Sequence, residues 1–270
     1  MALTQLQRVI CRLLAGNRIA SGESYVAGGV ALNLQLAADR ISRDIDLFHD
    51  SEAALEATWR ADRQLLEESG FAVKVLRERP GLVEAEVAGR GDRVRMEWAR
   101  DSAFRFFPLV EHDELGLTLH PFDLATNKVL ALVGRLEARD WVDVLECDRG
   151  LQPLGYLTWA ACGKDPGFSP ASILEHAART SRYSAEEVAQ LSFAGASPDV
   201  GFLSRRWREM LAAAREIHDL LPPEEVGKCV LTTAGDLSRS SPQQLRGALE
   251  RREVRFHAGR LRGALPQLGR

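Results

Sequence analysis

Long apolar runs are missing from this 270-residue chain, and so are closely spaced cysteines and histidines. No stretch approaches the ~20 uninterrupted apolar residues of a membrane-spanning helix, and the N-terminus lacks a secretory pattern. We therefore expect a cytoplasmic protein with no membrane partner. The scattered cysteines exclude a cysteine-ligated metal site and favour a reducing compartment. No serine lies in a nucleophile-elbow pattern, so covalent hydrolase chemistry is unsupported. The four cysteines are Cys11, Cys147, Cys162 and Cys229.

What is present is an ordinary globular composition, 45% hydrophobic and 27% charged, with enough chain for one large domain or two small ones. The net charge of −3 hides an asymmetry. Residues 239–270 hold eight arginines and two glutamates, a surplus of +6, so the preceding residues carry −9. A basic tail on an acidic protein indicates either work on a polyanion or an arginine-rich, solvated helical surface. Charge alone leaves both interpretations open.

The most informative stretch is residues 25–48, where two expected strands flank an apolar helix. The second strand carries Asp44 and Asp46 two residues apart. Side chains at i and i+2 of a strand point to the same face, so these two carboxylates are forced side by side. Like charges this close need compensation, and a divalent cation with oxygen ligands is the usual one. The pattern predicts a magnesium site beside bound phosphates.

The turn before the helix supplies the phosphate half of this prediction. Gly28 and Gly29 break the first strand and open the helix. Bare backbone N–H groups at a helix N-terminus, together with the positive end of the helix dipole, favour phosphate. Either feature alone would more often be a tight turn or a solvated acidic pair. Joined within about 25 residues in this order, they predict nucleotide chemistry.

Gly28-Gly29 followed by Arg-Ile-Ser-Arg-Asp-Ile-Asp-Leu-Phe at residues 40–48 resembles the first motif of the DNA polymerase β-like nucleotidyltransferases. More narrowly, it resembles the AbiEii/AbiGii-type nucleotidyltransferases, many of them toxins of toxin–antitoxin systems. The resemblance covers roughly residues 20–150. It implies an α+β fold: a nucleotidyltransferase domain with a small mixed sheet at residues 1–150, then a mainly α-helical domain at residues 151–270. Many relatives have Gly-Ser in place of Gly-Gly, so one hydroxyl contact is lost here while the backbone donors remain.

A third carboxylate is needed to hold the metal nearest the attacking hydroxyl in two-metal nucleotidyl transfer. Residues 82–88 and 93–99 alternate in polarity around a glycine-containing turn and are expected to form a hairpin. The resemblance places the third carboxylate on a strand after the Asp-x-Asp strand, and Glu97 is the matching residue. Glu84 and Glu86 on the adjacent strand are competitors for this role.

Further along, Lys128-x-x-Ala-Leu-x-x-Arg135-x-x-x-Arg139-Asp140-x-x-Asp143 resembles later motifs of the AbiEii-type family. The resemblance implies that the lysine contacts nucleotide phosphates and that the Arg-Asp pair completes the active site. Asp140 is expected to position a nucleobase, a sugar or an acceptor hydroxyl. Asp143 could equally be a structural partner of an arginine. The segment reads as two helices, the first beginning near an N-cap at Asp123.

From residue 150 onwards the pattern is mainly helical and carries little chemistry. The C-terminal domain could bind the acceptor, cover the nucleotide or serve as scaffold alone. Pro222-Pro223 is expected to stop the longest helix. The expected helices are 153–162, 169–180, 184–193, 200–221 and 242–250, with one short strand at 228–233.

The resulting hypothesis is transfer of a nucleoside monophosphate from a nucleoside triphosphate to an acceptor hydroxyl, with two Mg²⁺ ions or Mn²⁺ in their place. The resemblance implies tRNA or another RNA as acceptor and an antitoxin protein as partner. A small-molecule acceptor of the antibiotic type, a protein acceptor and a non-catalytic nucleotide-binding partner are the alternatives. The expected catalytic residues are Asp44, Asp46, Glu97 and Asp140, of which the first three bind metal; the expected nucleotide-binding residues are Gly28, Gly29, Ser42, Arg43, Lys128 and Arg135.

Overall fold

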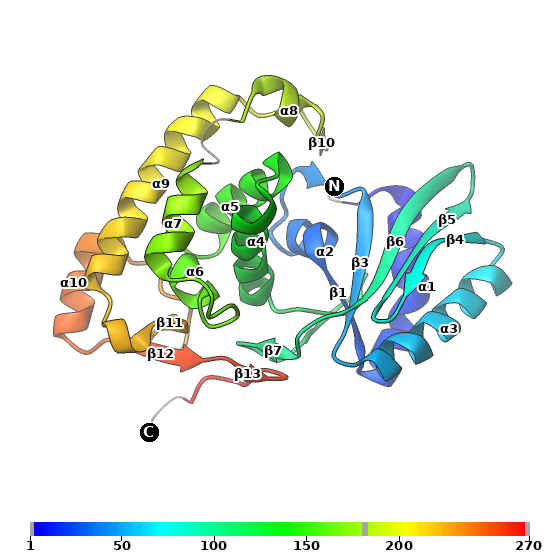
Figure 1. Ribbon diagram of the computed structural model, residues 1–270, viewed down its shortest axis with the longest axis horizontal. Helices are drawn as coiled ribbons and strands as arrows, with labels where there is room; N and C mark the ends of the chain where they lie inside the picture. The colour runs from blue at the N-terminus through cyan, green and yellow to red at the C-terminus, as the bar shows by residue number, and fades with distance from the viewer. Residues whose placement is uncertain (1–2, 180–182, 268–270) are drawn as a thin grey trace. The chain divides into compact units, whose positions relative to one another are not determined.

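The computed structural model describes residues 3–179 and 183–267. Packing divides the chain into two compact units (Figure 1). The first unit runs to Ala103 and resumes at Pro108–His120, and the second comprises Phe104–Phe107 and the chain from Pro121 onwards. The last segment of the first unit ends at His120, and the expected domain boundary at residue 150 stays a prediction. Across the described residues, no helix is long and apolar enough to cross a membrane.

The first unit is built on a mixed seven-stranded sheet in the order β4-β5-β6-β3-β1-β9-β8. β3 lies parallel to β6 and antiparallel to β1, so its two neighbours run in opposite directions. The elements of this unit are α1 (Gln5–Ser21), β1 (Ser24–Ala27), α2 (Gly28–Gln35), β2 (Arg40–Ile41), β3 (Asp44–His49), α3 (Glu52–Glu68), β4 (Ala72–Arg79), β5 (Leu82–Gly89), β6 (Asp92–Arg100), β8 (Val110–His112) and β9 (Gly116–Thr118).

One face of this sheet is covered by α1 and α3 (Figure 1). The helices begin at side-chain caps, Thr4 for α1 and Ser51 for α3, which satisfy otherwise orphaned N–H groups. Trp59 of α3 packs edge to face on Trp98 of β6, with 4.7 Å between the ring centroids. The Trp98 indole N–H donates to the carboxylate of Asp62 at 3.0 Å. Burying these rings supplies much of the apolar area that holds helices to sheet.

The opposite face of the same sheet is polar. Alternation along β3, β5 and β6 sends apolar residues to the helices and charged residues to this other face. Arg95 of β6 lies between acidic neighbours on both sides and makes a 2.7 Å ion pair with Glu84 of β5. The helix α2 follows β1 directly and packs against β1 and β3.

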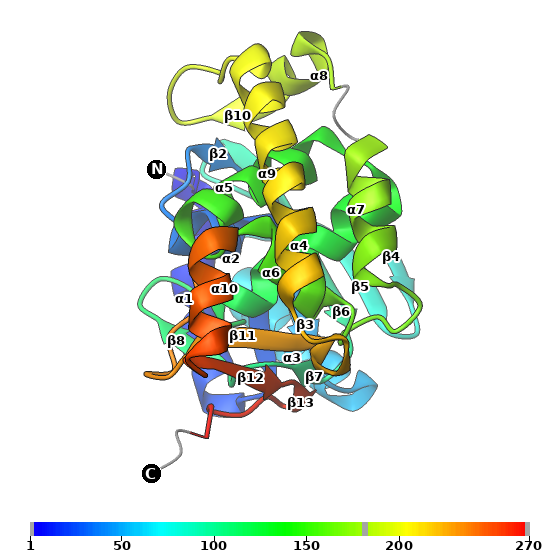
Figure 2. The same ribbon diagram turned by 90° about the vertical axis from the view of Figure 1, so that its left-hand side faces the viewer.

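The second unit is mainly helical, as expected for the C-terminal part of the chain. Its longest helix, α9, packs against α6, α7 and α10, and Figure 2 shows α7 and α10 alongside it. The elements of this unit are β7 (Phe104–Arg105), α4 (Pro121–Arg135), α5 (Ala138–Gly150), α6 (Leu154–Ala161), α7 (Pro170–Arg179), α8 (Ala185–Ala189), β10 (Ser192–Phe193), α9 (Val200–Leu220), the 3₁₀ turn η1 (Pro223–Glu225), β11 (Lys228–Thr232), α10 (Pro242–Glu250), β12 (Val254–Ala258) and β13 (Arg260–Leu261).

The helices of the second unit approach closely through glycine. A Cβ at Gly155 of α6 would lie 2.8 Å from the Cβ of Ile217 and 3.0 Å from the Cα of Ala214, both on α9. The bare glycine therefore lets the two helices pack backbone to side chain. The surrounding core of this unit comprises Tyr156, Trp159, Ile217, Leu221, Val230 and Leu245.

The segment 101–116 contains β7 and β8 and the start of β9. Two local expectations from the sequence were wrong. The helix expected at 184–193 ends at Ala189 and is followed by β10. Asp123 does not cap α4, which starts at Pro121; its buried carboxylate accepts instead from the backbone N–H groups of Phe106 and Phe107 at 2.9 and 3.0 Å. The expected helical end at Thr180 lies outside the described residues.

Candidate active site

The two aspartates of the Asp-x-Asp pair lie on the polar face of the sheet. β3 exposes Asp44 and Asp46 in part, while Ile45 and Leu47 between and after them are fully buried on the helix-covered face. The period of two along the strand therefore produces the side-by-side carboxylates that the sequence predicts. Both belong to the central strands of the sheet, where backbone pairing on two sides fixes their positions.

Glu97 is brought next to this pair. In the parallel register of β3 and β6, Asp46 pairs with Glu97 and Asp44 pairs with Arg95. Burial raises the pKa of the half-buried Glu97 carboxyl, and the negative charges of Asp46 and Glu84 raise it further. Of the competing glutamates, Glu84 lies one strand further from β3 and is held by Arg95. The strand order thus gives Glu97 the position beside the aspartates.

The Gly-Gly turn presses directly on the carboxylate pair. Gly28 has a left-handed backbone, with φ of 63°, and Ala27 before it pairs with Asp46 across β1 and β3. A Cβ at Gly28 would lie 1.7 Å from Oδ2 of Asp46, which no side chain could tolerate. Only glycine permits both the backbone conformation and the close approach. The helix that starts here has no side-chain cap, because its N-cap residue is Ala27.

Ser42 and Arg43 precede the first aspartate. Ser42 is buried, its hydroxyl donates to the carbonyl of Asp44 at 3.3 Å, and its own carbonyl accepts from the Gln7 side chain at 2.7 Å. A Cβ at Gly29 would lie 2.9 Å from the Ser42 hydroxyl oxygen, so the hydroxyl packs on the first turn of α2. Arg43 is exposed. Ser42 is therefore part of the packing of this turn.

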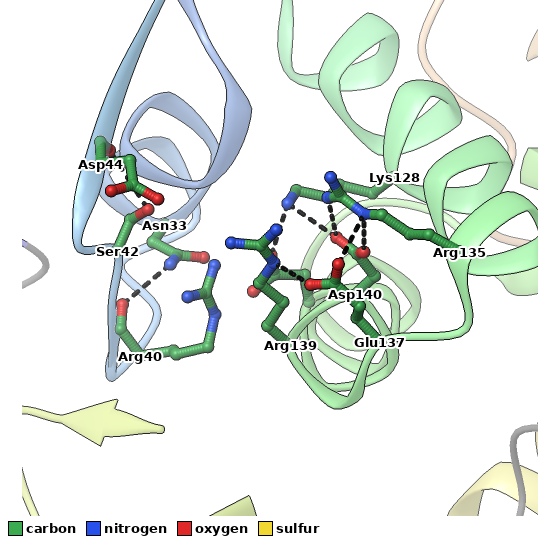
Figure 3. A network of polar contacts seen from close by, with 10 residues as sticks. Asn33, Arg40, Ser42, Asp44, Lys128, Arg135, Glu137, Arg139 and Asp140 are labelled. Carbon is green, nitrogen blue, oxygen red and sulfur yellow. Dashed lines mark hydrogen bonds and ion pairs between the residues drawn. The ribbon is translucent and has the colours of Figure 1, made fainter. Parts of the chain in front are cut away.

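The later motif forms a compact ion-pair network within the second unit (Figure 3). Lys128 of α4 lies 3.0 Å from Oδ1 of Asp140 and 3.0 Å from Oδ2 of Asp143, both on α5. Arg135 at the end of α4 grips Asp140 with two N–H groups, Nε to Oδ2 at 2.6 Å and Nη2 to Oδ1 at 3.0 Å. Two buried carboxylates are thereby matched by two cations.

A sharp corner between the two helices makes this network possible. Leu136 has a positive φ of 54°, which turns α5 back beside α4 and brings Asp140 within reach of Arg135. Burial works to raise the pKa of Asp140, but hydrogen bonds and charges from Arg135 and Lys128 outweigh it and lower the pKa. Asp140 therefore stays ionised and holds the cations in place. Its direct contact with a nucleobase, a sugar or an acceptor, which the sequence suggested, stays a prediction.

Two arginines of these motifs, Arg40 and Arg139, are outside the expected set of nucleotide-binding residues. Arg40 is almost completely buried, and its backbone carbonyl accepts from the Asn33 side chain at 2.8 Å. Arg139 makes a 2.6 Å ion pair with Glu137 and stays partly exposed.

The donor set on the polar face is chemically suited to Mg²⁺, which prefers carboxylate oxygens. Asp44, Asp46 and Glu97 provide only oxygen donors, and the imidazole of His49 at the end of β3 is buried on the other face of the sheet, with Ile45 and Leu47. In the described parts of the chain, however, no three acidic, histidine or cysteine side chains are gathered tightly enough to form a ready-made cation cage. The residues fit the ion in kind and in strand register, and binding would require their side chains to turn toward one another.

Comparison with known protein families decides the family of this chain. Residues 12–155, more than half of its length, match the family described as nucleotidyl transferase AbiEii toxin, type IV toxin–antitoxin system. The chain belongs to this family. The match spans both the Gly-Gly and Asp-x-Asp segment and the later lysine, arginine and aspartate pattern, so the resemblance found in the sequence is confirmed. A comparison with curated protein sequences finds no match.

Solved structures agree with the family in fold. JHP933 from Helicobacter pylori is 15% identical with a TM-score of 0.51, and the alignment covers 80% of this chain and 94% of that one. MenT4, a nucleotidyltransferase toxin from Mycobacterium tuberculosis, is also 15% identical with a TM-score of 0.51, covering 81% of this chain and 85% of that one. The expected fold class, an α+β nucleotidyltransferase fold followed by a helical part, is confirmed.

Proposed function

We propose that this member of the AbiEii family is a metal-dependent nucleotidyltransferase that moves a nucleoside monophosphate from a nucleoside triphosphate to an acceptor hydroxyl. The observation that carries the proposal is that Asp46, Glu97 and Gly28, which come from three separate segments of the chain, are neighbours at β3. Asp46 pairs with Glu97 on one side of β3 and presses on Gly28 on the other. A purely structural strand has no need of two neighbouring carboxylates against a side-chain-free helix start.

In this proposal, the first unit performs the chemistry. Asp44, Asp46 and Glu97 would hold two Mg²⁺ ions, or Mn²⁺ in their place. When bound, these ions supply charge stabilisation at the α-phosphate and lower the pKa of the attacking hydroxyl. The backbone N–H groups of Gly28 and Gly29 receive phosphate oxygens at the start of α2. Ser42 and Arg43 add donors to the phosphates, and pyrophosphate leaves.

The second unit contributes cations and their positioning. Lys128 and Arg135 neutralise phosphate charge, and the buried carboxylates of Asp140 and Asp143 keep their ammonium and guanidinium groups fixed. Asp140 therefore acts in this proposal as a positioning residue. The support is that these positions fall inside the family match together with the Asp-x-Asp segment.

The acceptor we propose is tRNA or another RNA, and the biological role is that of a toxin held in check by an antitoxin protein. The family description names a type IV toxin–antitoxin system, and the arginine-rich segment 239–270 favours a polyanionic acceptor. Binding through phosphates should weaken steeply with salt. Transfer to a small molecule or to a protein uses the same metal chemistry and is the alternative outcome of the experiment below.

The test is transfer of label from each α-³²P nucleoside triphosphate with Mg²⁺, with and without total RNA, by the wild-type protein and by Asp46→Asn. We expect label on RNA and a loss of rate of at least about a thousandfold in the variant, since one metal ligand supplies several kcal/mol of barrier lowering. Label on a small acceptor or on protein would replace the RNA assignment.

The matched control is Glu86→Gln, which removes one carboxylate from the same sheet face two strands away from β3. Its activity should stay within about threefold of wild type, because surface charges at this distance are largely screened. A folded Asp46→Asn protein with wild-type transfer, or a wild-type protein that labels nothing with any nucleotide, would overturn the proposed function.

A further inference from the structure

The second unit contains a pocket of about 440 Å³ that none of the expected site residues lines. It is formed by the end of α5, the middle of α9 and the loop that leads into α10, and Figure 2 shows α10 alongside α9. Part of its wall is apolar and comes from Pro153, Met210 and Ile217, of which the last two are 3% and 1% exposed. Pockets of roughly this volume, with apolar walls and a few polar groups, are typical of small-ligand sites.

Three arginines from three different elements line the same pocket. Arg149 lies at the end of α5, Arg206 on α9 and Arg239 in the loop before α10. The side chains of Arg149 and Arg206 are 68% and 47% exposed, and Arg239 is exposed as well. A guanidinium binds phosphate oxygens through its planar N–H groups and stacks on aromatic rings, so an apolar wall beside accessible guanidinium groups suits a nucleotide.

Two acidic residues of the pocket do not cancel this positive charge. Asp148 is buried and engaged within the protein, since its carboxylate accepts from the backbone N–H of Leu154 at 2.8 Å and pairs with Arg206 at 2.8 Å. Glu209 is 70% exposed and lies 3.8 Å from the same arginine. The lining therefore carries three positive and two negative side chains, with one positive charge in surplus.

Arg239 is oriented by main-chain contacts. Its Nη1 and Nη2 groups donate to the carbonyls of Leu151 and Arg149 at 2.8 and 2.7 Å, at the C-terminal end of α5. A guanidinium has five N–H groups, so two such bonds fix its position and still allow it to donate to a ligand. The loop is held too, because the Tyr156 hydroxyl donates to the carbonyl of Ser240 at 2.9 Å. Groups fixed before binding lose less conformational entropy on binding.

We propose that this pocket, called here the arginine pocket, binds one unpaired nucleotide of the acceptor RNA. The phosphate lies against Arg206 and Arg239, and the base lies against the apolar wall. Proteins bind single-stranded RNA by stacking its bases and contacting its phosphates in this way. The proposal rests on the proposed function for RNA as the acceptor, and it gives the second unit the role of acceptor binding.

A competing explanation is that these arginines only stabilise the fold, Arg239 at the end of α5 and Arg206 as the partner of Asp148. Ala213 separates the two explanations, because it lines the pocket from α9 and takes part in none of these contacts. Ala213→Glu fills the pocket and adds a negative charge while every arginine is kept. Ala212→Glu is the matched control, because Ala212 is exposed, lies outside the pocket lining and adds the same charge to the same helix.

The experiment measures binding of fluorescent polyuridylate, total tRNA and uridine monophosphate to the full chain in EDTA, over a range of salt concentrations. A second pair of variants is Arg239→Gln and its control Arg215→Gln, an exposed arginine of α9 outside the pocket lining. Circular dichroism checks folding. Transfer assays with Mg²⁺ then give the KM for RNA and the KM for the nucleoside triphosphate.

We expect Ala213→Glu and Arg239→Gln to weaken polyuridylate binding about tenfold at low salt, the lower end for hydrogen bonds to charged groups. Arg239→Gln should also reduce the slope of log affinity against log salt by roughly 0.7, the value for one single-strand phosphate contact. The KM for RNA should rise and the KM for the nucleoside triphosphate should not. Both controls should bind RNA like wild type.

Equal RNA affinity in Ala213→Glu and Ala212→Glu overturns this inference, and if Ala213→Glu does not fold, equal affinity in Arg239→Gln and Arg215→Gln does so. Weaker binding of uridine monophosphate with unchanged binding of RNA also overturns it, because the pocket would then hold a free nucleotide. The proposed function fails separately, if RNA binding depends on the arginine pocket but no label reaches RNA in the presence of Mg²⁺.

Discussion

Two pairs of carboxylates lie in this chain in opposite electrostatic settings. Asp46 and Glu97 are neighbours on β3 and β6, on a half-exposed sheet face, and their like charges raise the pKa of Glu97 after burial has done so. Asp140 and Asp143 are fully buried on α5, yet Lys128 contacts both, and the pKa of Asp140 is lowered. The carboxylate with the raised pKa thus belongs to the more exposed pair.

The two settings separate carboxylates suited to binding a ligand from carboxylates that stabilise the fold. A buried acid whose charge is matched by fixed cations is already satisfied, and removing it leaves cations without their partner. An acid whose pKa is raised by neighbouring acids gains stabilisation when a cation binds beside it, which is how perturbed groups mark functional sites. Replacing Asp46 or Glu97, the sheet pair, should therefore change ligand binding more than the free energy of unfolding. Replacing Asp140 or Asp143, the helix pair, should mainly lower the free energy of unfolding.

The largest expected effect on stability comes from Asp140→Ala. It removes the carboxylate that both Lys128 and Arg135 contact, and breaking a buried ion pair lowers the free energy of unfolding by about 3–5 kcal/mol. Urea denaturation of variant and wild type measures the loss. Arg135→Gln is the matched control and should lose less than about 1 kcal/mol, because the Arg135 side chain is 44% exposed.

The pH dependence sharpens this prediction. Because the pKa of Asp140 is lowered below its ordinary value of 3.8, its contribution is present above that value and is lost as pH falls through the folded-state pKa. Asp140→Ala and wild type should thus converge in stability at low pH. Equal stability of the two proteins at neutral pH would show that the network is only a surface arrangement and would remove the contrast drawn above.

Gly28→Ala tests how tightly the turn presses on the sheet pair. The left-handed backbone alone disfavours alanine by about 1–2 kcal/mol, and the new Cβ would collide with the Asp46 carboxylate. We expect a lower melting temperature and a loss of nucleotide transfer. Gly16→Ala in α1 is the control, since nothing lies near its added Cβ; it should raise stability by about 0.5–1 kcal/mol. Equal effects at both glycines would deny the special role of the turn.

The same contrast explains what the sequence could and could not predict. The strand–Gly-Gly–helix–strand order and the shared face of Asp44 and Asp46 follow from local periodicity, and Glu97 from alternation plus strand pairing. The short strands between 104 and 118 have two or three residues each and are too short to show a period. These elements are defined by backbone partners that are remote in sequence.

The contacts of the ion-pair network could not be predicted from the sequence for a similar reason. The sequence places Lys128 and Asp140 twelve residues apart, but their contact depends on the left-handed conformation of Leu136, a residue type that rarely adopts it. Asp123 is a residue type typical of helix N-caps. Its carboxylate instead accepts from the backbone N–H groups of Phe106 and Phe107, seventeen and sixteen residues earlier, which is a tertiary contact. Local patterns predict elements, and contacts between elements decide what a charged residue does.

The smallest expected effect on stability is also the most direct test of the Asp46 and Glu97 pair. Because the folded-state pKa of Glu97 is raised above its ordinary value of 4.5, the folded protein holds the Glu97 proton more tightly than the unfolded chain does. The resulting penalty is absent below that value and complete above the folded-state pKa. Glu97→Gln should therefore stabilise the metal-free protein at neutral pH, by less than about 1 kcal/mol since the group is half-exposed.

This gain should vanish on acidification and reverse when Mg²⁺ is added, because wild type alone then gains a ligand for the ion. Thermal unfolding across pH 4–8, with EDTA or with Mg²⁺, measures both changes. Glu86→Gln on the same face is the control of opposite sign: its carboxylate lies 3.8 Å from Arg93, so losing it should slightly destabilise the protein. If Glu97→Gln destabilises in EDTA as Glu86→Gln does, Glu97 is an ordinary paired surface acid, and the contrast with Asp140 rests on Asp140 alone.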